Sequence, residues 1–370
     1  MLVGVLKEIK SEENRVSMTP AGVEIMKKNG HNVFVEKNAG VGSGFEDTAY
    51  TLAGAEIVET AQEVFARSEI VMHVKEPLPA EYDLIKKDQI VFCYLHLAAD
   101  EDLTHALMKS GAICIAYETI QQPDGSLPLL TPMSEVAGRM AIQQGAKYLE
   151  KCHGGGGLLL GGVPGVDPGN VVIIGGGIVG VNAAKMACGL GAKVYILDMN
   201  LDRLRYLSDI MPSNCFPLMS NPSTIRKLLQ DADVVVGAVL IPGAKAPKLI
   251  DRDMLKDMKN GAVLVDVAID QGGCFETSRP TTHSDPIYTV DDVVHYCVAN
   301  IPGAVPKTST MALTNATLPY AVKIANLGWA NALKEDSAIK RGANIIRGEI
   351  TYRAVADAFN LGYTPVDKLI

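Results

Sequence analysis

The stretch that decides the fold is NVVIIGGGIVGVNAAKMACGLGAKVYILD, residues 170–198, in which a glycine-rich turn and a helix-like segment join two apolar runs. The turn carries Gly175, Gly177 and Gly180 in a GxGxxG pattern, and Asp198 follows at the usual offset of about 20 residues. In a strand–turn–helix unit the first glycine permits the tight turn, the second lets backbone N–H groups approach a pyrophosphate, and the third lets helix and strand pack closely. The stretch therefore predicts a dinucleotide site on a Rossmann fold.

The same stretch indicates which dinucleotide is bound. Asp198 is expected to accept hydrogen bonds from the adenosine ribose and to repel a 2′-phosphate, so we expect NAD(H) rather than NADP(H). Arg203 and Arg205 lie nearby, and their charges keep the NADP interpretation open. Ile178 and Val179 open the helix, whose N-terminus favours phosphate, and are expected to line the site together with the glycines.

The composition is that of a globular enzyme with two domains. The chain has 370 residues, of which 48% are hydrophobic and 21% charged, and domains usually hold about 100 to 200 residues. The net charge of −8 argues against a nucleic-acid partner but not against small anionic substrates, which need only a local cluster of basic groups. No P-loop and no GxSxG pattern occurs, so phosphoryl transfer and serine hydrolysis lack their signatures.

The cysteines and the apolar segments indicate a soluble cytoplasmic protein. Seven cysteines are scattered along the chain without a CxxC pair, as is typical of reduced thiols. The N-terminal segment meets charge at Lys7, so it lacks the core of a signal peptide, and no apolar stretch reaches the ~18 residues of a membrane span. Cys152 and His153 are adjacent, but two neighbouring ligands do not make a zinc site, and we predict no metal.

Short apolar runs alternate with helix-like segments on both sides of the decisive stretch. This pattern predicts an α/β protein with two Rossmann-like, doubly wound, mostly parallel sheets and a ligand cleft between the two domains. We expect a discontinuous substrate domain, 1–130 and 306–370, into which an NAD-binding domain with its connecting helix, 131–305, is inserted.

Local signals predict several helix boundaries. Thr19 before a proline and Thr60 with a glutamate three positions later match N-cap preferences, and Ser134 is expected to cap the connecting helix. The long helical pattern after Pro306 is expected to be broken or kinked near Pro319.

Four polar residues are candidates for chemistry: Arg15, Lys75, His96 and Asp270. Lys75 and His96 close two successive strand-like runs, and ligands bind where the carboxyl ends of parallel strands meet. Paired with Lys75, His96 is a reasonable general acid or base, although a lone histidine in such a place is more often structural. Arg15 follows two acidic residues, so a surface ion pair is its simpler interpretation.

Asp270 closes an apolar run and precedes a glycine turn, where it would face the nicotinamide end of the cleft. Asp266 lies in the same run, and one of the two could simply cap a turn. Asn300 lies in a Pro/Gly loop and is expected to contact the nicotinamide.

Nearly the whole chain resembles the alanine dehydrogenase family. The resemblance rests on KEIKSEENRVSMTPAGVEIMKKNGHNVFVEKNAGVGSGF (7–45), VKEP (74–77), YLHLA (94–98), VVIIGGGIVG (171–180) and VDVAIDQGGCFETSRPTTHSDPIY (265–288). It implies reversible, NAD-dependent oxidative deamination of L-alanine to pyruvate and ammonium, in L-alanine catabolism, by a homohexamer. Transhydrogenase domain I shares several strings and is the alternative; a non-catalytic NAD sensor is a further one.

The resemblance also implies residue roles. Arg15 and Lys75 would bind the substrate carboxylate and carbonyl, and His96 and Asp270 would be catalytic. The further cofactor contacts would fall on Ser134, Asp198, Arg203, Ser220, Val239, Leu240, Val267, Ala268, Ile269, Asp270, Arg279, Val298, Ala299, Asn300 and Ile301.

Overall fold

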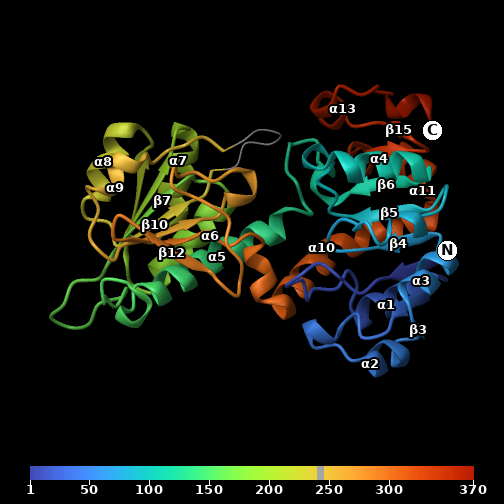
Figure 1. Cartoon of the computed structure of the whole chain (residues 1–370), viewed down its shortest axis with the longest axis horizontal. Helices are drawn as coiled ribbons and strands as arrows, with labels where there is room; N and C mark the ends of the chain where they lie inside the picture. The colour runs from blue at the N-terminus through green and yellow to red at the C-terminus, as the bar shows by residue number, and fades with distance from the viewer. Residues whose placement is uncertain (240–245) are drawn as a thin grey trace. The chain divides into compact units, whose positions relative to one another are not determined.

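The computed structural model describes residues 1–239 and 246–370, which divide into two compact units. Unit 1 comprises Met1–Met133 and Val305–Ile370, and unit 2 comprises Ser134–Ala304, so unit 2 is inserted between two segments of unit 1. Each unit contains a sheet of mostly parallel strands with helices (Figure 1), which confirms the predicted α/β class.

Among the described residues, the sheet of unit 1 has eight strands in the order β15-β14-β6-β5-β4-β1-β2-β3. The six N-terminal strands run parallel, whereas the C-terminal segment adds β14 antiparallel to β6 and β15 antiparallel to β14. These strands are β1 (Leu2–Val5), β2 (Asn32–Glu36), β3 (Glu56–Val58), β4 (Ile70–Met72), β5 (Ile90–Cys93), β6 (Ile113–Ala116), β14 (Ala343–Ile346) and β15 (Glu349–Ile350). The residues of β5 and β6 are all buried, as expected for parallel strands covered on both faces.

Two helices of unit 1 begin where the capping signals placed them. The side chains of Thr19 and Thr60 accept hydrogen bonds from the backbone N–H groups of Gly22 and Glu63, which confirms both predicted N-caps. The expected break at Pro319 is absent, because α10 continues through the proline and ends before Gly328, whose φ is 74°. The helices are α1 (Pro20–Lys28), α2 (Asp47–Leu52), α3 (Ala61–Arg67), α4 (Glu101–Ser110), α10 (Pro306–Leu327), α11 (Trp329–Glu335), α12 (Ser337–Gly342) and α13 (Arg353–Phe359), with 3-10 turns η1 (Val41–Ser43), η2 (Tyr82–Leu84), η3 (Leu97–Ala99), η4 (Tyr117–Thr119) and η8 (Val366–Lys368).

Within the same described ranges, the sheet of unit 2 has seven strands in the order β12-β13-β11-β10-β7-β8-β9, and only the edge strand β12 is antiparallel to its neighbour. Its core packs β7, β10 and β11 against residues of α8 and α9. The strands are β7 (Asn170–Ile174), β8 (Lys193–Asp198), β9 (Cys215–Met219), β10 (Val234–Gly237), β11 (Val263–Asp266), β12 (Ile287–Val290) and β13 (Val293–Tyr296). The helices are α6 (Ile178–Gly189), α7 (Leu201–Ile210), α8 (Pro222–Leu229) and α9 (Arg252–Leu255), with 3-10 turns η5 (Lys151–His153), η6 (Ile269–Gln271) and η7 (Ile301–Ala304).

The connecting helix α5 (Thr131–Tyr148) starts earlier than predicted. Ser134 lies inside its first turn and is not its N-cap, so that prediction is wrong. Pro132 at the second helical position explains the earlier start, because proline has φ fixed near the helical value and no N–H group that the first turn must satisfy.

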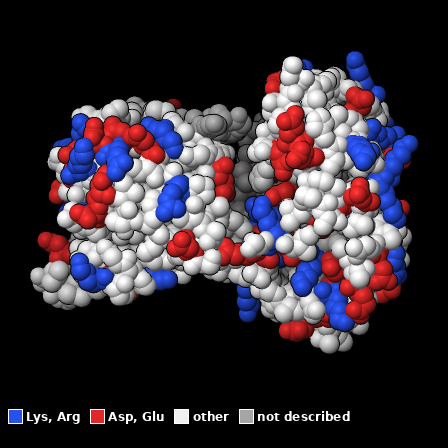
Figure 2. Space-filling model, viewed as in Figure 1, with Lys and Arg blue, Asp and Glu red and all other residues white. Residues whose placement is uncertain are grey.

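The surface carries mixed charge. Figure 2 shows acidic and basic side chains interspersed on the visible face of each unit. Within the described ranges, no helix has both the length and the apolar character of a membrane span.

Candidate active site

In unit 1, polar residues follow the carboxyl ends of four neighbouring parallel strands. β1, β4, β5 and β6 lie side by side in that part of the sheet, and each is followed by a loop or a 3-10 turn. Because parallel strands end at one edge of a sheet, these loops converge, and this edge is where open α/β sheets bind ligands. The polar residues of these segments include, in strand order, Glu8, Lys75, His96 and Glu118.

Arg15 is buried in an ion pair, not exposed on the surface. Its Nε donates to Glu13 Oε1 at 2.7 Å and its Nη2 to Glu13 Oε2 at 2.6 Å, while Nη1 lies 3.1 Å from Met133 Sδ. Burial by itself lowers the pKa of Arg15, but the hydrogen bonds to Glu13 outweigh it and raise the pKa. The surface ion-pair interpretation is therefore wrong, and Arg15 is a fixed positive charge in the interior of unit 1.

A buried network of two carboxylates and an imidazole supports the loop that carries Lys75. Glu8 accepts hydrogen bonds from the backbone N–H groups of Val74 at 2.6 Å and Lys75 at 3.3 Å, and from His73 Nδ1 at 3.2 Å. His73 Nε2 lies 3.2 Å from Glu81 Oε1. Burial lowers the pKa of His73, but Glu8 and Glu81 together raise it to about 10, so this imidazole is a buried cation.

His96 lies at the end of β5 in a left-handed conformation, with φ 49° and ψ 35°. Glu118 holds it there: its Oε1 accepts from the backbone N–H of His96 at 2.7 Å and lies 3.8 Å from His96 Nδ1. The ring stacks on Tyr94 with an interplanar angle of 1°, and its side chain is 48% exposed. His96 thus combines a fixed backbone with an accessible imidazole.

Tyr94 and Glu8 are neighbours that Arg15 shares with His96 and Lys75, respectively. Arg15 interacts electrostatically with the Tyr94 hydroxyl and with the Glu8 carboxylate. Since Tyr94 stacks on His96 and Glu8 binds the backbone of Lys75, the three candidates of unit 1 share neighbouring residues.

In unit 2 the three glycines meet the steric demands of a dinucleotide loop. Gly175 has φ 111°, and a Cβ on Gly180 would lie 1.8 Å from the carbonyl oxygen of Gly175. Gly177 is the N-cap of α6, and a Cβ there would have open space around it, with no atom within 4 Å. The loop thus packs tightly where helix meets strand and leaves its Gly177 face open beside the helix N-terminus.

Asp198 ends β8 and reaches back to this loop. Its Oδ2 accepts from Gly176 N at 2.9 Å and its Oδ1 from Asn200 N at 2.8 Å, which fixes the carboxylate while leaving it further lone pairs. Arg203 Nε donates to Gly176 O at 2.7 Å, and Ser220 N donates to Asp198 O at 2.9 Å. Arg203 therefore contacts the glycine turn, and Ser220 contacts Asp198 itself.

Asp266 and Asp270 have different surroundings. Asp266 is buried and accepts from the backbone N–H groups of Ala268 at 3.1 Å and Cys274 at 2.8 Å, and burial raises its pKa despite these bonds. Asp270 lies in η6 with an exposed side chain. Asp266 is thus the residue that ties the turn together, and Asp270 is the accessible carboxylate.

The remaining predicted cofactor positions lie on loops of unit 2. Val267 N donates to Gly237 O at 3.0 Å, and the left-handed Asn300, with φ 61°, accepts from His283 Nε2 through its carbonyl at 3.1 Å. The Arg279 guanidinium lies 4.0 Å above the Tyr288 ring. Val239 is half-buried, and Leu240 lies outside the described residues.

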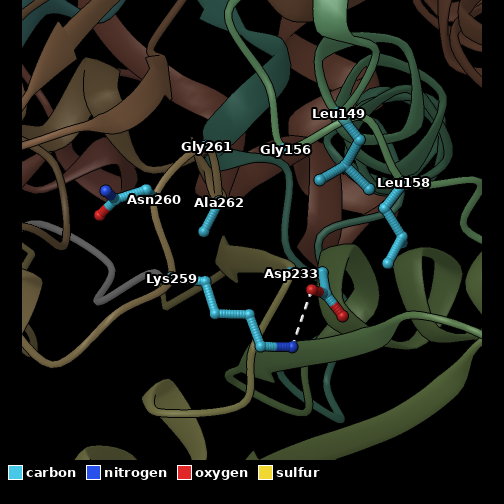
Figure 3. Close-up of a pocket in the computed structure, with 8 residues that line it drawn as sticks. All are labelled: Leu149, Gly156, Leu158, Asp233, Lys259, Asn260, Gly261 and Ala262. Carbon is cyan, nitrogen blue, oxygen red and sulfur yellow. Dashed lines mark hydrogen bonds and ion pairs between the residues drawn. The ribbon is translucent and has the colours of Figure 1, made fainter.

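A cavity of about 230 Å³ lies in unit 2, at the end of the sheet opposite the glycine loop (Figure 3). Asp233 and Ala262, which precede β10 and β11, line it, and Lys259 Nζ bonds Asp233 Oδ1 at 2.9 Å. The cavity therefore lies at the amino ends of the strands, away from the glycine loop at their carboxyl ends.

The acidic residues before Arg15 already indicated its ion pair, whereas Glu8 and Glu118 were not predicted. Glu13 has a local signal, since it lies two positions before Arg15. Glu8 and Glu118 have none, because their contacts depend on the order of strands in the sheet.

Comparisons with known proteins identify the family. Residues 4–137 and 141–353 match the families described as Alanine dehydrogenase/PNT, N-terminal domain and C-terminal domain. The chain is 58% identical over 371 residues to an alanine dehydrogenase of Methanococcus maripaludis, covering 100% of both chains. Among solved structures, an L-alanine dehydrogenase matches with TM-score 0.95 at 52% identity, over 97% of this chain and 99% of that one.

A transhydrogenase of Sinorhizobium meliloti matches with TM-score 0.82 at 21% identity, over 96% of this chain and 100% of that one, which shows a shared fold. The two family matches together cover nearly the whole chain, and the full-length relative is more than half identical. The chain therefore belongs to the alanine dehydrogenase/PNT family.

Proposed function

We propose that this chain catalyses the reversible reaction of L-alanine, NAD⁺ and water to pyruvate, ammonium, NADH and a proton. The observation that carries the proposal is the 58% identity to an alanine dehydrogenase over the full length of both chains. The charged cluster at the strand ends of unit 1 supports it, because an α-amino acid presents a carboxylate that a buried arginine can bind.

NAD is the cofactor that the residues of unit 2 fit. The open Gly177 face beside the N-terminus of α6 suits a pyrophosphate, and the fixed Asp198 carboxylate suits the two ribose hydroxyls. When bound, NAD⁺ would supply the acceptor for the hydride from the substrate Cα. We assign further cofactor contacts to Ser134, Ile178, Val179, Arg203, Ser220, Val239, Leu240, Val267, Ala268, Ile269, Arg279, Val298, Ala299, Asn300 and Ile301.

Arg15 and Lys75 are proposed to bind the substrate. Glu13 occupies the Nε and Nη2 side of the guanidinium, so the substrate carboxylate is expected to approach Nη1, which now contacts the weak acceptor Met133 Sδ. Lys75 would polarise the carbonyl of pyruvate with its ammonium group.

His96 and Asp270 are proposed to move protons. The deamination releases protons as the amine becomes an imine and as water adds to it, so the reaction needs an accessible base. His96 has an exposed imidazole on a fixed backbone, and Asp270 has an exposed carboxylate next to a turn that Asp266 holds.

A spectrophotometric assay tests the function directly. We expect NADH formation at 340 nm that depends on L-alanine, and NADH consumption that requires both pyruvate and ammonium. Reduction of an NADP analogue by NADH without alanine turnover would favour the transhydrogenase alternative. Saturable NAD(H) binding without either reaction would favour the sensor.

We further propose a homohexamer in the cytoplasm. The seven cysteines are all free thiols, as is typical of proteins from reducing compartments. Light scattering coupled to size exclusion tests the assembly, with six times the chain mass of 39.4 kDa as the expected result.

A further inference from the structure

We propose that Glu150, Cys152 and His153 form a binding site for a divalent cation of the zinc class on unit 2. One carboxylate oxygen, one sulfur and one imidazole nitrogen from these residues all lie within 4.8 Å of one another. Mixed sulfur, nitrogen and oxygen ligands suit Zn²⁺ and similar borderline ions, whereas Mg²⁺ and Ca²⁺ take oxygen ligands. The site is independent of the proposed reaction.

The ligand spacing is close to that of a tetrahedral site. Bonds of about 2.3 Å to sulfur and about 2.0 Å to nitrogen and oxygen place sulfur and oxygen ~3.5 Å apart, and nitrogen and oxygen ~3.3 Å apart. In the structure, Cys152 Sγ lies 3.6 Å and His153 Nε2 lies 4.0 Å from Glu150 Oε2. The first distance fits this geometry, and the second is ~0.7 Å longer, a gap that movement of the exposed Glu150 and half-buried His153 side chains would have to close.

The backbone holds the three ligands in this arrangement. Glu150 O accepts from His153 N at 3.1 Å and from Gly155 N at 3.2 Å, so the chain folds back on itself around η5. A Cβ on Gly155 would lie 2.2 Å from Tyr148 O, which shows how closely the turn packs on the end of α5. The metal therefore meets a preformed turn, and little conformational entropy is lost on binding.

The imidazole is oriented by an aromatic contact. The His153 ring packs edge-on against Tyr148, with centroids 5.4 Å apart, and Tyr148 is buried against Tyr296. This contact limits rotation of His153 while its Nε2 faces Glu150. Such fixing of a ligand ring is what neighbouring groups do in metal sites.

Sequence reasoning set this pair aside because two adjacent ligands do not make a site. The turn of η5 supplies the third ligand by bringing Glu150 beside Cys152. Cys152 is the exposed cysteine of the chain, since the other six are buried, so a metal in solution can reach its sulfur. Three protein ligands leave a fourth position for water.

The turn that would carry the ion is joined to the sheet of unit 2. Gly156 follows the turn, donates to Gly261 O at 2.9 Å and lines the cavity of Figure 3 with it, directly before β11. Metal binding is therefore expected to raise the melting temperature in proportion to the logarithm of free metal above its Kd.

The test uses Co²⁺ as a spectroscopic probe on the tag-free, chelator-treated full-length protein. We expect a near-ultraviolet absorption band from cobalt–thiolate charge transfer that saturates at one ion per chain and is displaced by Zn²⁺. Cys152→Ser should abolish the band. Glu150→Gln and His153→Gln should each weaken cobalt binding at least about tenfold, since even outer-sphere partners contribute 10- to 100-fold.

The matched control is the Glu101–His105 pair on α4, which has an imidazole–carboxylate distance of 3.7 Å but no thiol. His105→Gln should leave the cobalt band unchanged. The absence of a thiolate band in the wild type, or a band that persists in Cys152→Ser, would overturn the proposal. All variants change exposed or half-exposed residues, and circular dichroism checks that each is folded.

Discussion

Glu13 and Arg15 form two parallel hydrogen bonds in the interior of unit 1, where their side chains are 0% and 2% exposed. The bonds use the Nε and Nη2 side of the guanidinium and so fix the direction of Nη1. Glu13 is therefore a positioning residue, which neutralises the buried Arg15 guanidinium and fixes its orientation.

Replacing Arg15 by lysine separates substrate binding from stability. Lysine keeps a positive charge beside Glu13 but cannot make the forked contact or present Nη1. A hydrogen bond to a charged group contributes about 1.5 to 3 kcal/mol, so Arg15→Lys should raise KM for pyruvate and alanine by roughly 10- to 100-fold. The NADH Kd should not change. An unaltered KM with only a lower melting temperature would make the pair purely structural.

Asp198→Gly should lower NAD⁺ affinity and relax discrimination against NADP⁺. The substitution removes the proposed ribose acceptor and the negative charge that repels a 2′-phosphate. The ratio of kcat/KM for the two cofactors measures this effect. Ser208→Ala, on the outer part of α7, serves as a control. An unchanged ratio in Asp198→Gly would place the ribose elsewhere.

Asp266, the last residue of β11, and Asp270, in the turn after it, should respond differently to amide substitution. Asp266→Asn turns one acceptor oxygen into a donor in a buried turn, which leaves an N–H group without its partner at a cost of about 1 to 3 kcal/mol. We expect lower thermal stability. Asp270→Asn should keep the melting temperature and lower kcat. Equal melting temperatures for Asp266→Asn and wild type would contradict the structural role of Asp266.

His73 should make the stability of unit 1 depend on pH. Its pKa is raised to about 10 in the folded chain, above the 6.5 of the unfolded chain, so its contribution is fully present below pH 6.5 and is lost as pH rises towards 10. The difference in unfolding free energy between wild type and His73→Gln should shrink over this window. Urea titrations at pH 6.5, 8 and 9.5 measure it. A difference that stays constant would mean that His73 is neutral.

Much of the fold follows from local sequence signals. The apolar runs predicted the strands, the threonine caps predicted two helix starts, and the glycine motif indicated Asp198. These predictions were possible because each signal acts over a few residues. Lys75 and His96 stood out because parallel strands end at one edge.

The contacts that hold these residues depend on distant parts of the chain. The backbone N–H of Val16, next to Arg15, donates to Thr310 Oγ1 at 3.1 Å, across 294 positions. No local pattern reveals such a contact, so the sequence alone could not tell a surface arginine from a buried one. Likewise Glu118 reaches His96 only because β6 lies beside β5.

The last prediction concerns His96. A positioned general acid or base contributes about 10² to 10⁴ in rate, so His96→Ala should lower kcat by that factor while NADH still binds. As a control, His105→Gln, which replaces an exposed histidine on α4, should leave kcat unchanged.

The pH profile tells a proton carrier from a structural residue. Wild-type kcat/KM for alanine should rise with pH along a limb that belongs to His96 and the groups coupled to it, because the base must be deprotonated to accept a proton. In His96→Ala the limb should disappear. Near-normal turnover with an unaltered profile in His96→Ala would contradict the assignment and leave Asp270 as the proton carrier.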